Sequence, residues 1–101
     1  MSFIADFKNI AGLYRSLFRD QRITAWHISL LSAIVFLYSL NPGLNYIEIS
    51  RRQLMSLAHI NSVATYHKYI RQLQDYGYIV YKPAYNYFDR SKIWIVGYSE
   101  E

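Results

Sequence analysis

The stretch ISRRQLMSLAHINSVATYHKYIRQLQDYGYIVY, residues 49–81, decides the fold, because it predicts two short helices followed by a strand. Ser50 and Gln53 have the spacing of a capping box, in which each side chain satisfies a free backbone donor at a helix start. A helix is therefore expected to begin near Arg51. Its buried stripe is expected at Leu54, Leu57 and Ala58.

A second helix is expected after a tight turn at residues 59–61. Ser62 is a favourable N-cap residue, and the following apolar rhythm indicates a buried face of Val63, Tyr66, Tyr69, Ile70 and Leu73. At about 100° per residue the opposite face is polar and mostly basic, and it carries Ala64, Thr65, His67, Lys68, Arg71, Gln72 and Asp75. Gly77 can adopt the left-handed conformation that ends a helix, so a strand is expected at residues 78–81.

This order of elements resembles the winged helix-turn-helix superfamily of DNA-binding proteins, in the form found in small bacterial regulators. The matching motifs are Ser-x-x-Thr at residues 62–65 and Leu-x-x-x-Gly-x-Ile at residues 73–79. The resemblance extends over residues 23–98 and leaves the N-terminal residues outside it. It implies an α+β, mainly helical fold, in which a three-helix core carries a small antiparallel β-hairpin wing and an extra N-terminal amphipathic helix is added.

Two regions are expected on this basis: an N-terminal packing or dimerisation helix at 1–21, and a DNA-binding domain at 22–98. The apolar face of the first helix is expected at Phe3, Phe7, Ile10, Tyr14, Leu17 and Phe18. The opposite side carries Lys8, Gly12, Arg15 and Arg19. This helix either covers its own domain or also packs on a second copy, and a homodimer would match a palindromic operator.

Residues 23–47 contain no formally charged side chain, and the segment 23–40 reaches the lower limit of a membrane-spanning helix. Polar residues such as Thr24, His27 and Ser32 are scattered through it, which favours a central core helix over a membrane span. Residues 41–43, Asn-Pro-Gly, are expected to end that helix.

Three strands are expected, namely a short one at residues 46–49 and a hairpin of 78–82 and 92–96 joined by a wing at 83–91. Alternation places one set of side chains inside the sheet: Ile47, Ile49, Ile79, Tyr81, Ile93 and Ile95. Trp94 is then expected on the other face, where it can cover an edge or a neighbouring helix.

The composition fits one domain of 101 residues without cysteine, which excludes disulfides, Cys-type zinc sites and thiol nucleophiles. The net charge is +4, and residues 51–92 hold seven Lys or Arg against two Asp, a net charge of +5 for that segment. The N-terminus lacks the pattern of a signal peptide, so a cytoplasmic protein is expected.

The residues expected to contact double-stranded DNA belong to three groups. Helix 62–76 is expected to enter the major groove, with candidates Ser62, Ala64, Thr65, His67, Lys68 and Arg71. The preceding helix offers Arg51 and Arg52 in its first turn, where cations oppose the helix dipole and a bound phosphate would explain them. The wing at 82–92 is expected on the backbone or minor groove through Lys82, Tyr85, Tyr87, Arg90 and Lys92.

Nothing in the sequence favours an enzyme, a metal site or a cofactor. His27, His59 and His67 have no metal-ligand spacing, and the chain has no phosphate-binding glycine loop. The resemblance implies a transcriptional regulator. A replication-initiation or mobile-element accessory protein, a winged-helix module that binds proteins, and a regulator that senses an aromatic effector remain open.

Overall fold

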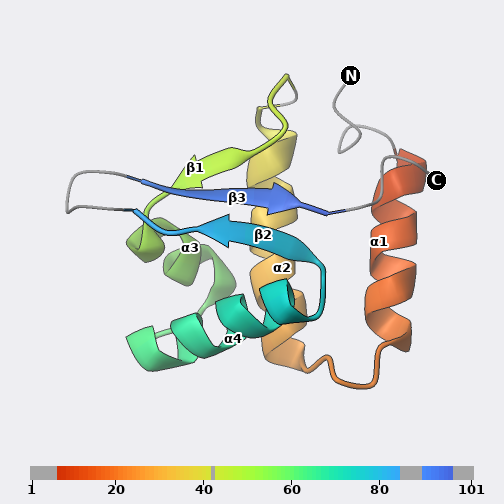
Figure 1. Cartoon of the computed structure of the whole chain (residues 1–101), viewed down its shortest axis with the longest axis horizontal. Coiled ribbons are helices and arrows are strands. Elements are labelled where there is room, and N and C mark those ends of the chain that lie inside the picture. Colours follow the sequence, from red (N-terminus) through yellow and green to blue (C-terminus); the bar gives the residue numbers. More distant parts are fainter. Residues whose placement is uncertain (1–6, 42, 85–89, 97–101) are drawn as a thin grey trace.

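A computed structural model of the chain describes residues 7–41, 43–84 and 90–96. Over these residues the protein is a small, mostly helical α+β structure with four helices and one three-stranded antiparallel sheet (Figure 1). The elements are α1 (Phe7–Arg19), α2 (Ala25–Ser39), β1 (Ile47–Ile49), α3 (Arg51–Ala58), α4 (Val63–Asp75), β2 (Ile79–Lys82) and β3 (Ser91–Ile95). The expected helix, turn, helix and strand within residues 49–81 are thus confirmed.

The sheet has the order β1-β3-β2, so the first strand pairs with the last, which is the second strand of the hairpin. Ile47 faces Ile93 across one ladder, and Ile79 faces Ile95 across the other. Because side chains alternate along a strand, these isoleucines point into the core together with Ile49, and all are buried. Ser91 belongs to β3 and is buried, so the loop of the hairpin ends one residue earlier than the sequence predicted.

Both predicted serine caps are present. The Oγ of Ser50 accepts a hydrogen bond from the Gln53 backbone N–H at 3.1 Å, and the Oγ of Ser62 accepts one from the Thr65 N–H at 3.2 Å. His59 closes α3 with a φ of 60°, and Gly77 follows α4 with a φ of 90°. Left-handed residues after both helices turn the chain sharply, so that α3 and α4 both pack on α2, and β2 packs on α4.

Two apolar residues of this region are exposed, although the sequence pattern placed them in the core. Leu57 is 38% exposed and Val63 is 43% exposed. Leu57 lies on the flank of α3 opposite the half-buried Met55, outside the narrow stripe that Leu54 and Ala58 define. Val63 occupies the first turn of α4, and Figure 1 shows that this end of the helix lies away from α2. Helical periodicity gives the direction of a side chain but not whether a neighbour covers it.

Helix α2 is the central element, and its polar residues connect it to the others. Ser29 donates a hydrogen bond to the Ala58 carbonyl at 2.6 Å, and Ser32 bonds the Tyr14 hydroxyl at 2.8 Å. These bonds explain how an uncharged but partly polar helix is buried without unpaired serine hydroxyls. In the described part of the chain, no helix is both long enough and apolar enough to span a bilayer.

Tyr38 joins the end of α2 to the sheet. Its buried hydroxyl has the Asn45 and Ile93 carbonyls as acceptors at 2.8 and 3.1 Å, and it accepts a hydrogen bond from the Ile95 N–H at 3.1 Å. Burial raises the pKa of this hydroxyl to about 12. Tyr38 therefore fixes the sheet to the helical core through a neutral, fully engaged hydroxyl.

Helix α1 packs on its own domain, as one alternative predicted, through a face that overlaps the predicted one but includes Leu13 and excludes Phe18. The buried residues are Leu13 and Leu17, whereas Phe18 is 67% exposed. The Tyr78 hydroxyl donates to the Asp20 carboxylate at 2.9 Å and adds a polar contact at the end of the helix. Phe3 and the side chains of Phe7 and Lys8 lie outside the described residues. Packing of α1 on a second copy stays a prediction.

His27 is a buried histidine whose ring nitrogens are both hydrogen bonded. Its Nδ1 accepts from the Thr24 backbone N–H at 2.8 Å, so the proton resides on Nε2, which donates to the Gln72 Oε1 at 2.7 Å. The Tyr69 and Tyr76 rings lie at 4.8 and 5.6 Å from its own. Burial lowers the pKa of His27, Lys68 lowers it further, and Gln72 and Asp20 oppose the change.

This neutral histidine predicts a loss of stability in weak acid. The unfolded chain takes up the proton near pH 6.5, while the folded chain resists it because Nδ1 faces an N–H donor. The free energy of unfolding should therefore be constant above about pH 7 and fall as the pH drops below about 6.5. Denaturant unfolding at about pH 7.5 and about pH 5.5 measures it. His27→Gln should flatten the dependence, and substitution of the exposed His67 by Gln should not. An equal slope for wild type and His27→Gln would refute the assignment.

Candidate nucleic-acid interface

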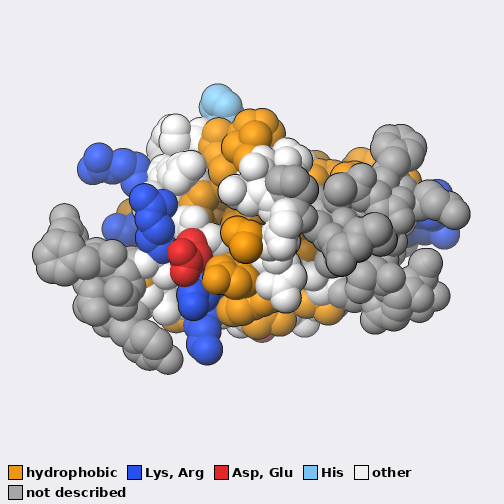
Figure 2. Space-filling model, turned by 90° about the horizontal axis from the view of Figure 1, so that it is seen from above, with side chains coloured by type: hydrophobic (Ala, Val, Ile, Leu, Met, Phe, Trp, Pro, Cys, Tyr) orange, Lys and Arg blue, Asp and Glu red, His pale blue; other side chains and the backbone are white. Residues whose placement is uncertain are grey.

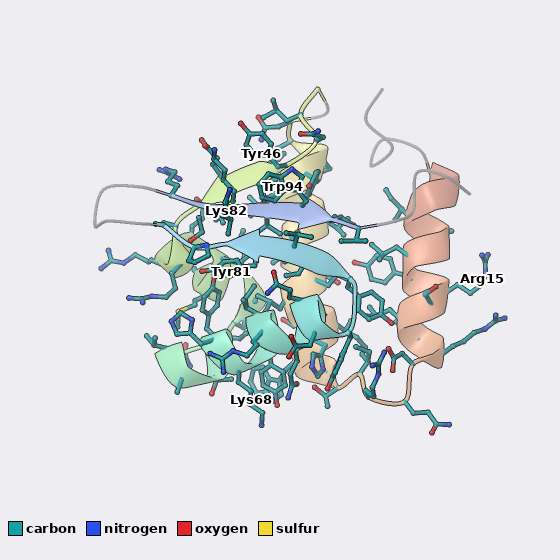
Figure 3. All side chains as sticks on the ribbon, in the orientation of Figure 1. Arg15, Tyr46, Lys68, Tyr81, Lys82 and Trp94 are labelled. Atoms are coloured by element: carbon teal, nitrogen blue, oxygen red, sulfur yellow. The ribbon has the colours of Figure 1, made fainter. Side chains whose placement is uncertain are left out.

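Helix α4 presents a polar surface opposite its core face. Tyr66, Ile70 and Leu73 are buried. The exposed candidates on the helix are Ser62, Ala64, His67, Lys68 and Arg71, and Thr65 is half-buried. Figure 3 shows Lys68 on the outer side of α4, away from the sheet. The structure therefore brings the major-groove candidates together on one accessible surface.

Among the described residues, no acid forms an ion pair with the two cations at the centre of this surface. Between described residues the ion pairs are Arg22–Asp20 at 2.7 Å and Lys92–Glu48 at 3.8 Å, and neither involves α4. The Lys68 ammonium lies 5.2 Å from the centre of the Tyr69 ring, which in turn stacks on Trp26 at 6.3 Å. This aromatic pair supports the lysine stem while leaving its charge in solvent.

Arg51 and Arg52 are exposed in the first turn of α3, as expected. Arg51 lies close enough to the buried Tyr66 hydroxyl for its charge to act on the pKa of that group, which burial raises. The charge of Arg51 at the start of α3 therefore lies within electrostatic range of Tyr66 in α4. Two arginines at a helix N-terminus oppose the helix dipole, so an anion between them and the backbone N–H groups would be stabilised.

The described basic residues of the hairpin do not all lie in the loop that was expected to form the wing. Arg90 is exposed in the loop, but Lys82 ends β2 and Lys92 lies within β3, where the two are cross-strand partners. Lys92 is half-buried, pairs with Glu48 of β1 and lies 5.4 Å from the Tyr46 ring centre. Figure 2 shows basic side chains gathered around an acidic one at this end of the sheet. Tyr85 and Tyr87 lie outside the described residues.

Val63 belongs to this exposed surface, although the sequence analysis did not include it among the candidates. It is exposed next to Ala64 at the start of α4. Val63 continues the repeat of Tyr66, Ile70 and Leu73, but the N-cap Ser62 places it in the first turn, at the very end of the helix. An apolar side chain there can contact a thymine methyl group.

Within residues 7–41, 43–84 and 90–96, no three His, Asp or Glu side chains gather in a way that could hold a metal ion. No family model matches the chain, and no curated protein or solved structure matches it either. The class of protein is therefore argued from the fold and from the α4 surface alone.

Proposed function

We propose that the chain is a winged helix-turn-helix protein that binds double-stranded DNA by sequence, and that it acts as a transcriptional regulator. The observation that carries this proposal is the pair of Lys68 and Arg71, which is exposed on the outer face of α4 and has no ion-pair partner among the described residues. The element order supports it, because α2, α3 and α4 form three core helices, β1 pairs with the hairpin, and α4 follows a tight turn after α3.

In this proposal α4 enters the major groove, which admits one α-helix. Arg71 and Lys68 donate to guanine O6 and N7, while the methyl groups of Ala64, Thr65 and Val63 contact thymine. Arg51 and Arg52 bind a phosphate at the start of α3, and the Ser62 end of α4 binds another. Phosphate contacts set the position of the protein, and the α4 contacts select the sequence.

The test is the binding of wild type, Arg71→Ala and Arg51→Ala to duplexes selected from a randomised pool. Arg71→Ala is expected to lose about 5- to 150-fold on the selected duplex, and little on a scrambled one, because a bidentate base contact is worth about 1–3 kcal/mol. Arg51→Ala is expected to weaken binding to both duplexes by a similar factor. Fluorescence anisotropy at fixed salt measures each affinity.

Arg15→Ala is the matched control, because this exposed arginine of α1 points away from α4 (Figure 3). It should bind both duplexes as wild type does. Equal affinity of wild type, Arg71→Ala and Arg51→Ala for the selected duplex would contradict the assignment of the interface. A wild-type protein with no preference in the pool would contradict the proposal itself.

A further inference from the structure

The outer face of the sheet, which is the face turned away from the core, carries aromatic and basic side chains together. We call it the outer sheet face and define it by Tyr46, Val80, Trp94, Lys82, Lys92 and Glu48. Figure 3 shows Tyr46, Trp94 and Lys82 at the sheet, on the side of the molecule opposite Lys68. The proposed major-groove surface on α4 therefore does not use this face.

The aromatic part of the outer sheet face is accessible. The Tyr46 and Trp94 ring centres are 5.4 Å apart and the rings are tilted by 45°. Val80 is the cross-strand partner of Trp94 and is 48% exposed. A shallow hollow of about 470 Å³ lies over this part of the sheet. It is lined by Val80, Tyr81, Lys82, Trp94, Ile95 and Val96. A flat ring can enter it and lie against the indole.

The basic part of the outer sheet face lies two residues further along the same strands. Lys82 and Lys92 face each other across β2 and β3, two residues from Val80 and Trp94. That step is roughly 7 Å along a strand, so the ammonium groups reach the rim of the aromatic platform. Glu48 is the acid on this face, and it holds Lys92 at 3.8 Å. The face thus pairs stacking surfaces with two cations and a single competing carboxylate.

We propose that the outer sheet face binds single-stranded nucleic acid, with unpaired bases stacked on Trp94 and Tyr46 and phosphates at Lys82 and Lys92. Base faces are accessible only when they are unpaired, so a stacking platform selects single strands over duplexes, and cations beside the rings follow the backbone. Lysine is depleted where proteins bind proteins, which favours a polyanion over a protein partner for this face. The inference does not rest on the proposed duplex binding.

Glu48 gives the proposal a distinctive consequence. A phosphate that binds Lys92 is repelled by the nearby Glu48 carboxylate, which lies 3.8 Å from the lysine in the free protein. Removing that charge in Glu48→Gln should strengthen binding of a single strand several-fold at low salt. A purely apolar partner on Trp94 would gain nothing from this substitution.

The test uses the Trp26→Phe protein, in which Trp94 is the single remaining tryptophan of the chain. Titration with short oligothymidylate should quench Trp94 fluorescence, because a stacked base contacts the indole directly. In parallel, anisotropy of a labelled oligothymidylate should show a loss of about 5- to 150-fold in Trp94→Leu and a smaller loss in Trp94→Phe. Thermal unfolding of each variant verifies that it is folded.

Three results would overturn the proposal: unquenched Trp94 fluorescence at saturating oligothymidylate, equal affinity of Trp94→Leu and wild type, or a duplex that competes as well as the single strand. Arg71→Ala should bind oligothymidylate as wild type does. A protein that binds single strands but no duplex would refute the proposed function and leave this inference standing, and the opposite pattern would do the reverse.

Discussion

Duplex binding is expected to weaken by roughly 40-fold when the NaCl concentration rises fourfold, from about 50 to about 200 mM. Three exposed arginines are proposed to contact phosphates: Arg51 and Arg52 at the start of α3, and Arg90 of the hairpin loop. If each neutralises one phosphate, the plot of log K against log salt has a slope of about −2.7, because condensed counterions are released. Anisotropy titrations at several salt concentrations measure the slope.

Substitution of single cations measures how much each residue contributes to this slope. Arg52→Ala should make it less steep by about one, since Arg52 is exposed at the start of α3. Arg15→Ala removes an arginine of the same kind from α1 and should leave the slope unchanged. A slope near zero for the wild type would exclude a phosphate-based interface.

Leu17→Ala is expected to lower the free energy of unfolding by about 2–5 kcal/mol, because it removes a fully buried side chain and leaves a cavity between α1 and the core. Phe18→Ala removes a larger side chain from the next position. Its expected cost is below about 0.5 kcal/mol, because the ring is 67% exposed. Denaturant unfolding of the two variants and the wild type gives both values.

This pair of substitutions separates two roles of α1. Equal losses for Leu17→Ala and Phe18→Ala at every protein concentration would contradict the packing described for the helix. A loss for Phe18→Ala that appears only at high protein concentration would mean that a second copy covers this ring, as the homodimer prediction requires.

The sequence predicted those features of the candidate site that depend on neighbouring residues. Ser50 and Ser62 cap their helices through hydrogen bonds to residues three positions later. Gly77 turns the chain after α4 because its backbone adopts a positive φ. Alternation within β1 and β3 was enough to place Ile47 and Ile93 inside. These are local rules, so the chain order alone determines them.

The local rules did not predict which residues at the margin of the core are buried. Leu57, Val63 and Phe18 satisfy helical spacing, yet each remains exposed. The sequence could not indicate this, because a periodic pattern defines the angle of a side chain and not the extent of the surface that meets it. The same limit explains why Leu13 was missed as the centre of the buried face of α1.

By itself, then, the sequence determined the helices, their caps, the strand faces and the basic character of α4. Tertiary structure alone decided that Tyr38 joins α2 to Ile95, 57 residues later, and that His27 bonds Gln72, 45 residues later. It also decided that Tyr46 meets Trp94, and that Lys92 pairs with Glu48. The physical reason is separation along the chain: no local preference encodes such contacts, and they form only when packing of the core brings distant segments together.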